Sequence, residues 1–366
     1  MKKLLTIATS VLLLVSCSEN DVKQTVLEQD YAIDFSATSD NTTKAAINSN
    51  EDLAKEGGFV VYGYKKAADA ADWSAAQTIF DAVNVTSSGN NGAYVEGSTT
   101  NWTYSPKKYW DKNGIYCFYA VAPANPTAGS YSVTGNADAK KIVVTNAASA
   151  ISTSSDDYLI SRAGVLNRPG SNQTDNVDFT FNHIMAKLGF KVQRQAGVTA
   201  TITVTEMKMT GWNSNAGTFT QSANATPNTI ECSEWEQSDG TAGSATLVGE
   251  GKTQTSVVLS TDNASELTDK YIMVPQAITY SKSDAGVETG LTFSLKYTLS
   301  YTADQHNGTA YSEDFEVEGV IPSTQTWGTD SYTIYTVKVG PKPIEFDVES
   351  IVDWTNKPTL DPTTIQ

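Results

Sequence analysis

Hydrophobic and polar residues alternate over long stretches of this chain, which is the pattern of half-buried β-strands. The cleanest run is residues 291–301, where leucine, phenylalanine or tyrosine occupies every second position and threonine, serine or lysine stands between. Residues 115–121 differ, because these seven residues carry no charge and most are aromatic or β-branched. A strand of that kind is covered on both faces. The patterns predict an all-β fold with residues 115–121 in its core.

A hairpin is predicted around this core strand. Asn113 and Gly114 precede it, and both residues tolerate the positive φ that a tight turn between antiparallel strands requires. The segment before the turn is rich in aromatic residues, and we expect Trp110 and Phe118 to be buried.

Two further amphipathic strands lie near the ends of the chain. In residues 31–37 one face carries Tyr31, Ile33, Phe35 and Ala37. In residues 344–354 one face carries Ile344, Phe346, Val348, Val352 and Trp354, and acidic residues lie on the other face. Each strand therefore has one apolar face that needs a groove.

The length of the chain favours two domains, because 366 residues exceed the usual size of one hydrophobic core. We place the boundary at residues 195–197, which gives an N-terminal domain over 45–195 and a C-terminal domain over 196–366. Both are expected to be antiparallel β-sandwiches. A change in strand phase near His183 predicts a bulge or bend, and residues 213–256 are expected to be mostly loop.

The N-terminus has the pattern of a lipoprotein signal. Lys2 and Lys3 precede an apolar run, and Leu14-Val15-Ser16-Cys17 resembles the site at which such signals are cut. We expect residues 1–16 to be a signal peptide, Cys17 to carry the acyl chains that anchor the protein in the outer membrane, and residues 17–44 to form a tether and prosegment. The alternative is a plain secretory signal in which Cys17 is accidental.

Charge and motifs argue against nucleic-acid binding and catalysis. The formal net charge is −16, and basic residues occur as isolated pairs rather than as a phosphate-binding cluster. The two histidines, His183 and His306, fall in different predicted domains. No nucleotide, metal or nucleophile motif is present. We therefore expect no enzyme, no cofactor and no metal site, although the facing carboxylates of a glycosidase leave no sequence signature.

Three short motifs resemble the fimbrillin family of pilins and adhesin-like surface lipoproteins. The first is W-x-Y-x-P-x-K-Y-W at residues 102–110, followed by the Asn-Gly turn, the core strand and an Ala-x-Ala-Pro end. The others are Phe-Asn-His-Ile-Met-Ala-Lys-Leu at 181–188 and Ile-Met-Val-Pro-Gln at 272–276. Their order along the chain, behind a lipoprotein-like signal, carries the resemblance.

The resemblance implies a fold, a processing step and a mode of assembly. The domains would be transthyretin-like sandwiches, and a trypsin-like protease would release the prosegment between Lys44 and Ala45. The C-terminal region of one subunit, here residues 344–354, would then donate a strand to another subunit. An ordinary solvated Lys44 is the alternative to cleavage, and pairing of the last strand within its own domain is the alternative to donation.

We therefore expect a structural or adhesive subunit of a cell-surface fimbria, with other fimbrial subunits, the outer membrane and a host or bacterial surface receptor as partners. The sequence leaves open whether the subunit belongs to the stalk, the anchor or the tip. The alternative is a surface lipoprotein that does not polymerise and binds glycan or protein. For glycan binding, exposed aromatic rings at Trp73, Trp212 and Trp235 would be needed, because these residues stand in polar segments.

Overall fold

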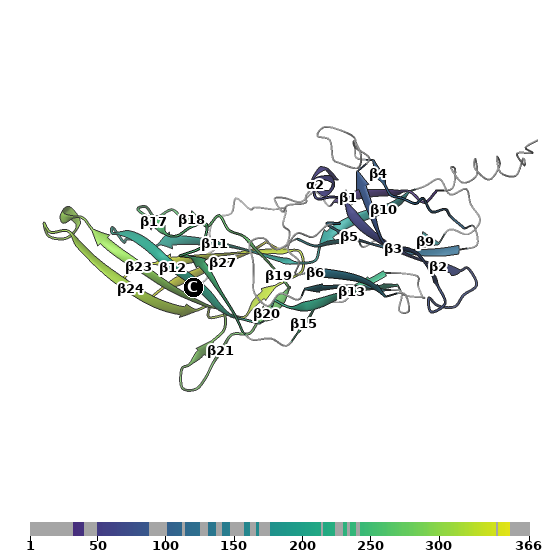
Figure 1. Ribbon diagram of the computed structural model, residues 1–366. Coiled ribbons are helices and arrows are strands. Elements are labelled where there is room, and N and C mark those ends of the chain that lie inside the picture. The colour runs from purple at the N-terminus through teal and green to yellow at the C-terminus, as the bar shows by residue number, and fades with distance from the viewer. Residues whose placement is uncertain are drawn as a thin grey trace, which may run out of the picture.

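The computed structural model describes residues 32–39, 50–87, 101–111, 114–124, 131–136, 141–146, 157–161, 166–167, 176–213, 215–223, 230–232, 235–238, 242–341 and 343–351. Strands make up most of this part of the chain, and its helical segments are α2 (Asn50–Lys55) and the 3-10 turn η2 (Ala303–Gln305). The prediction of an all-β fold is confirmed (Figure 1).

The first sheet curls around a cluster of aromatic side chains. Its strand order is β1 (Phe35–Ser39), β10 (Val177–His183), β8 (Leu159–Ser161), β5 (Gly114–Ala122), β2 (Phe59–Ala67), β3 (Gln77–Ser87) and β4 (Trp102–Thr103), and β9 (Leu166–Asn167) pairs with β5. The two ends of this order, β1 and β4, approach each other. The enclosed side chains, which we call the N-terminal cluster, include Phe35, Phe59, Phe80, Phe118 and Phe179.

A second sheet covers the other face of the first. It runs β14 (Ile230–Cys232), β13 (Gly217–Ala223), β7 (Lys141–Asn146) and β6 (Tyr131–Asn136), with β15 (Glu236–Gln237) on β13. Between the two sheets lies the middle cluster, which includes Tyr62, Tyr119, Val144, Phe219, Trp235 and Val274.

The third and fourth sheets enclose the C-terminal cluster, which includes Phe190, Ile202, Trp212, Phe293, Trp327 and Tyr335. The third runs β18 (Ser265–Glu266), β11 (Ala186–Arg194), β26 (Ser331–Val339) and β27 (Glu345–Ile351), with β19 (Tyr271–Met273) on β11. The fourth runs β16 (Gly243–Val248), β12 (Thr201–Trp212), β23 (Thr292–Tyr301) and β24 (Tyr311–Val320), with β17 (Val257–Leu259) on β12. Short pairs join β20 (Gln276–Ile278) to β25 (Gln325–Trp327) and β21 (Ser281–Lys282) to β22 (Glu288–Thr289).

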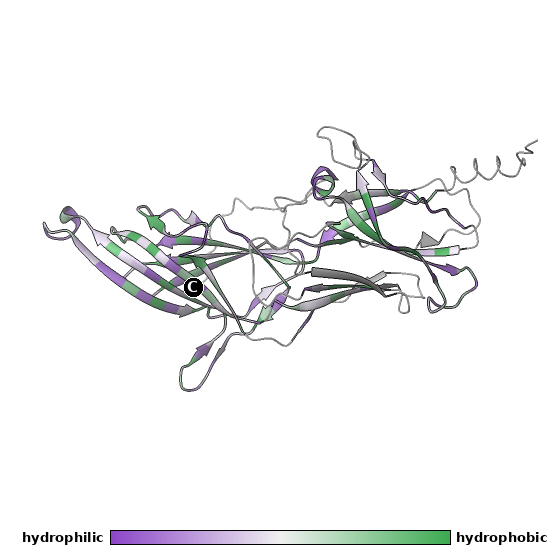
Figure 2. Cartoon of the chain, viewed as in Figure 1, coloured by the Kyte–Doolittle hydropathy of each residue, from purple (hydrophilic) through white to green (hydrophobic). Residues whose placement is uncertain are grey.

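The core strand predicted at residues 115–121 is β5, and it is covered on both faces. Its side chains at 116, 118, 120 and 122 belong to the N-terminal cluster, and those at 115, 117, 119 and 121 belong to the middle cluster. In β23, by contrast, the buried side chains are confined to one face, and Figure 2 shows green and purple residues alternating along β23 and β24. Both hydropathy patterns are therefore explained by the number of layers that cover each strand.

Strand pairing crosses the boundary that we predict at residues 195–197. β11, which precedes the boundary, pairs in parallel with β26, and β13, which follows it, pairs with β7. Gly197, with φ of 79°, lies in the turn between β11 and β12. The chain instead passes from the first sheet to the third after His183, where the sequence predicts a bend. The division into domains stays a prediction.

The expectation that residues 213–256 are mostly loop is wrong in part. β13, β14, β15 and β16 all lie within this range. Phe219 of β13 is 3% exposed, because the second sheet packs it into the middle cluster. Polar residues dominate this segment because the other face of the second sheet lacks a covering layer among the described strands.

Candidate functional site

β1 is the short strand that we expect to be exchangeable, and its apolar face is buried as predicted. Ile33, Phe35 and Ala37 are 0%, 4% and 4% exposed, and all three belong to the N-terminal cluster. Tyr31, the fourth residue of the predicted face, lies outside the described residues. The strand stands at one end of the order of the first sheet, so its removal would interrupt no other strand pair among the described residues.

Phe35 lies in a socket made of other aromatic rings. Its ring centroid is 5.3 to 6.0 Å from those of Phe80, Tyr104, Phe118 and Phe179. The Phe179 ring is stacked on Phe35, and the Phe80 and Phe118 rings meet it edge to face. Such arrangements add to the free energy gained from burial of apolar surface.

Backbone and polar contacts hold β1 from both sides. On one side it pairs in parallel with β10, from Phe35 opposite Val177 to Ser39 opposite Phe181. On the other side, two residues before β1 begins, the Ile33 amide donates to the Lys108 carbonyl oxygen at 2.8 Å, and Ala32 pairs with Tyr109. β1 therefore occupies a slot that is one strand wide.

The segment that forms the second wall of this slot also contacts β1 through side chains. The Tyr104 hydroxyl donates to the Ile33 carbonyl oxygen at 2.5 Å, and the Lys107 ammonium pairs with the Asp34 carboxylate at 2.5 Å. Burial raises the pKa of Tyr104 to about 12, so its hydroxyl keeps its proton and stays a donor at neutral pH. Tyr104 is a residue of the first motif that resembles the fimbrillins, and Lys107 occupies one of its unspecified positions.

The hydrophobic contribution of β1 comes mainly from two side chains. Full burial of an Ile or Phe side chain contributes about 1.5 to 3 kcal/mol. Ile33 and Phe35 together therefore give about 3 to 6 kcal/mol, before the cost of ordering the strand. This is the apolar contribution that these two side chains make to holding β1 in place.

The candidate donor strand near the end of the chain is β27. It pairs antiparallel with β26, from Glu345 opposite Lys338 to Ile351 opposite Tyr332, and forms one edge of the third sheet. Ile344 and Phe346 pack on the C-terminal cluster, and the Phe346 ring lies 5.6 Å from that of Phe293. β27 therefore pairs within its own chain here, as the alternative to donation expects.

Val348 is less buried than its place on the predicted apolar face suggests. It is 37% exposed, and β27 is an edge strand of the third sheet. The remaining site residues of the prediction, Cys17, Lys44, Ala45, Val352 and Trp354, lie outside the described residues.

The tryptophans on which the glycan-binding alternative depends are buried. Trp73, Trp212 and Trp235 are 5%, 1% and 9% exposed. Trp235 donates its ring N–H to the Ile184 carbonyl oxygen at 2.6 Å, and the Lys66 ammonium lies 5.2 Å from the Trp73 ring centroid. Each ring belongs to a hydrophobic cluster, so none of the three forms a surface for stacking a sugar.

A buried ion pair lies where the chain passes between sheets. The His183 Nδ1 is 2.8 Å from an Asp157 carboxylate oxygen, and both side chains are more than nine-tenths buried. Burial alone lowers the pKa of His183, but the neighbouring Asp157 carboxylate more than offsets it, so the net pKa is raised above 6.5. Burial lowers the pKa of the nearby Lys187. Because the pair is sealed from solvent, we assign it to structure and not to catalysis.

No group of three or more His, Cys, Asp or Glu side chains suited to a metal ion occurs in the part of the chain that the structure describes. Within that same part, none of the helices has the length and apolar character needed to cross a membrane.

We compared the sequence with models of known protein families to learn which family this chain belongs to. The fimbrillin-like family model matches residues 38–354, which is most of the chain. This chain belongs to the fimbrillin-like family. The resemblance inferred from the three motifs is thus confirmed, and family membership supports a fimbrial subunit role at the cell surface. No curated protein sequence matches the chain.

Solved structures that resemble this chain have very different sequences. A fimbrial protein from Bacteroides vulgatus superposes with a TM-score of 0.59 at 15% identity, covering 89% of this fimbrillin-like chain and all of the other. A putative cell adhesion protein from Bacteroides ovatus gives 0.43 at 13% identity, covering 90% and 99%. The tip fimbrial protein Mfa3 from Porphyromonas gingivalis gives 0.32 at 12% identity, covering 81% and 95%. At these identities the likeness to the first structure shows a shared fold.

Proposed function

We propose that this protein is a structural or adhesive subunit of a fimbria, exported as an outer-membrane lipoprotein through Cys17 and assembled by strand exchange. The observation that carries the proposal is the β1 slot. A short strand with one buried apolar face closes the first sheet, and it lies upstream of the candidate cleavage site at Lys44. Release of β1 would uncover an aromatic groove with unpaired backbone groups, which invites strand addition from a neighbour.

The C-terminal region carries side chains that fit this slot. The chain that enters β1 reads Ile-Asp-Phe at residues 33–35, with an aliphatic, an acidic and an aromatic residue in succession. The same order recurs as Ile-Glu-Phe at residues 344–346 and as Val-Asp-Trp at residues 352–354. In either window the aromatic ring would replace Phe35 in its socket, and the acidic residue would replace Asp34 opposite Lys107.

The two segments, residues 344–346 and residues 352–354, differ in how much strand pairing is lost when they are donated. Use of residues 344–346 requires β27 to leave β26, with the loss of the pairing that the structure shows. Use of residues 352–354 leaves that pairing intact, because the window begins after the last residue of β27. We therefore favour the later window as the insert, with β27 as the arm that presents it.

The proposal is tested by the assembly state of surface-extracted protein. Wild type and Lys44→Arg, which keeps a site for a trypsin-like protease, are expected to give detergent-resistant ladders. Lys44→Ala and a chain truncated after Gly340 are expected to give monomer. Lys55→Ala is the matched control, because Lys55 is an exposed lysine of α2 outside the slot.

A chain truncated after Ile351 separates the two windows. It keeps β27 and loses Val352 and Trp354, so loss of the ladder points to the later window. The donor-strand role is wrong if Lys44→Ala and the Gly340 truncation both form ladders like wild type.

A further inference from the structure

The hairpin of β23 and β24 ends in a loop at the far end of the molecule from β1 (Figure 1). The two strands pair in unbroken register from Thr292 opposite Val320 to Tyr301 opposite Tyr311. Residues 302–310 form the loop, which includes η2. We call this end of the hairpin, residues 301–313, the tip.

Three rings gather at the tip. The imidazole of His306 is stacked on the Tyr311 ring, with centroids 4.8 Å apart and an interplanar angle of 17°. Tyr301 lies beside them, 6.1 Å from His306 and 6.4 Å from Tyr311. Tyr311 is 41% exposed and His306 is exposed. A cross-strand Tyr301–Tyr311 pair stabilises the end of a hairpin, and the histidine extends the aromatic surface there.

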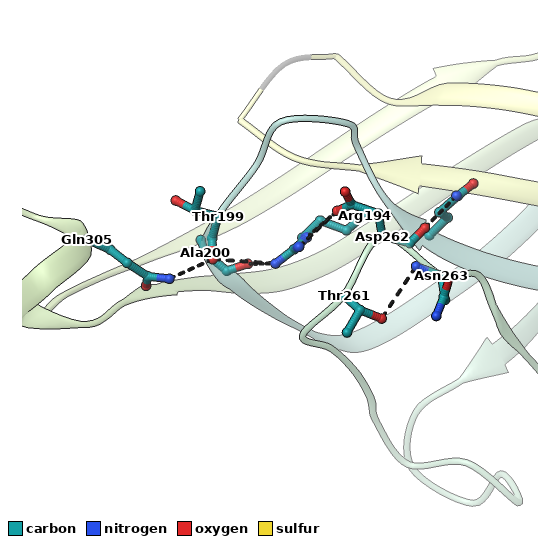
Figure 3. Close-up of polar contacts among 8 residues, drawn as sticks. Arg194, Thr199, Ala200, Thr261, Asp262, Asn263 and Gln305 are labelled. Atoms are coloured by element: carbon teal, nitrogen blue, oxygen red, sulfur yellow. Dashed lines mark hydrogen bonds and ion pairs between the residues drawn. The ribbon is translucent and has the colours of Figure 1, made fainter.

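Hydrogen bonds fix the loop that carries this histidine (Figure 3). The Gln305 side chain accepts from the Thr302 amide at 2.9 Å and donates to the Thr199 carbonyl oxygen at 2.9 Å. The loop at Thr199 is itself clamped, because the Arg194 guanidinium donates to the Ala200 carbonyl oxygen at 3.0 Å and to Asp262 at 2.8 to 3.0 Å. A surface held in this way loses little conformational entropy when a ligand binds.

The polar groups around the rings indicate which ligand fits. Residues 301–313 contain no lysine or arginine, so an anionic ligand finds no counter-charge there. Thr302, Asn307 and Thr309 offer donors as well as acceptors, and Asp304 offers acceptors only. The Glu313 carboxylate accepts a hydrogen bond from the Tyr311 hydroxyl, which raises the pKa of that tyrosine. Mixed donors and acceptors beside exposed rings suit a ligand that is rich in hydroxyl groups and has an apolar face.

We propose that the tip binds a neutral saccharide, with one face of the sugar ring stacked on the outer face of His306, which is itself stacked on Tyr311, and its hydroxyl groups bonded to the polar side chains of residues 302–309. The buried tryptophans cannot serve this purpose, and the tip provides the exposed aromatic surface that they lack. The inference is independent of strand exchange, because the tip and the β1 slot lie at opposite ends of the molecule.

The test is saturation-transfer difference NMR on residues 17–366 carrying Cys17→Ala, which removes the acylation site. The probes are the methyl glycosides of glucose, galactose, mannose and N-acetylglucosamine. We expect transfer to ring C–H protons of at least one glycoside. His306→Ala and Tyr311→Ala are expected to weaken its binding about three- to ten-fold, which is the range for loss of one aromatic contact.

Two controls separate binding from folding. Tyr109→Ala removes a ring that is 42% exposed on the segment that pairs with Ala32 beside β1, and it is expected to leave binding at the tip unchanged. His306→Ala alters no residue of the β23–β24 ladder, so a matching thermal unfolding curve shows that the hairpin persists. The proposal is overturned if no glycoside shows transfer, or if transfer is the same in both tip variants. It is also overturned if tetra-arginine binds at the tip and the glycosides do not.

Discussion

The strength with which Phe35 holds β1 in its slot is open to direct measurement. A sequence-specific protease site is placed in residues 40–44, and the folded protein is cut there so that β1 stays only by non-covalent contacts. Phe35 is 4% exposed and its ring meets four others. Truncation of such a ring costs about 3 to 5 kcal/mol. At about 1.4 kcal/mol per factor of ten, Phe35→Ala should weaken retention of β1 about 100- to 4,000-fold.

The assay follows the cut fragment by gel filtration and native mass spectrometry over time. Asp34→Asn is the matched control, because Asp34 neighbours Phe35 but makes a partly exposed ion pair with Lys107. Such a pair contributes at most about 1 kcal/mol, or about five-fold. A synthetic peptide of residues 350–358 is expected to speed release of the wild-type fragment. If Phe35→Ala retains the fragment as long as Asp34→Asn does, the ring does not hold β1 and the reasoning fails.

Three further predictions follow from the same contacts. Phe118→Ala should lower the free energy of unfolding by about 3 to 5 kcal/mol in denaturant titrations, because the ring is fully buried; a loss below about 1 kcal/mol contradicts its place in the core. The raised pKa of His183 means that the stability it contributes is present below about pH 6.5 and is lost as pH rises through the folded-state pKa. Wild type should therefore lose stability between pH 6 and 9 by more than His183→Gln does, and equal slopes would show that the pair with Asp157 carries no charge. Labelled fatty acid should appear in wild type and be absent from Cys17→Ala; label retained in the variant excludes Cys17 as the acylation site.

Local alternation was enough to predict which residues of several strands face the core. β5 was predictable because two covering layers leave no polar position, and β1 because one covering layer leaves every second position polar. These features depend on side chains that the strand itself carries. The motif at residues 102–110 indicated the family, but only the structure shows that Tyr104 and Lys107 of this segment contact the β1 segment directly.

Burial of single rings in polar segments was decided only by the tertiary structure. Trp235 stands among polar neighbours in sequence, yet it is buried because its ring N–H reaches Ile184, a residue 51 positions away. The tip gathers its rings in the same way, since Tyr301 meets Tyr311 through strand register and Gln305 is held by a carbonyl 106 positions away.

The path of the chain between sheets was likewise beyond local patterns. The sequence marks a phase change near His183, but it does not say that β11 will pair with β26 or β13 with β7. Those pairings join residues more than 70 positions apart, and the hydrogen bonds of a ladder are the same whichever strands make them. The residues of a strand determine which of its faces is apolar. The strand with which it pairs is determined by the packing of the whole chain.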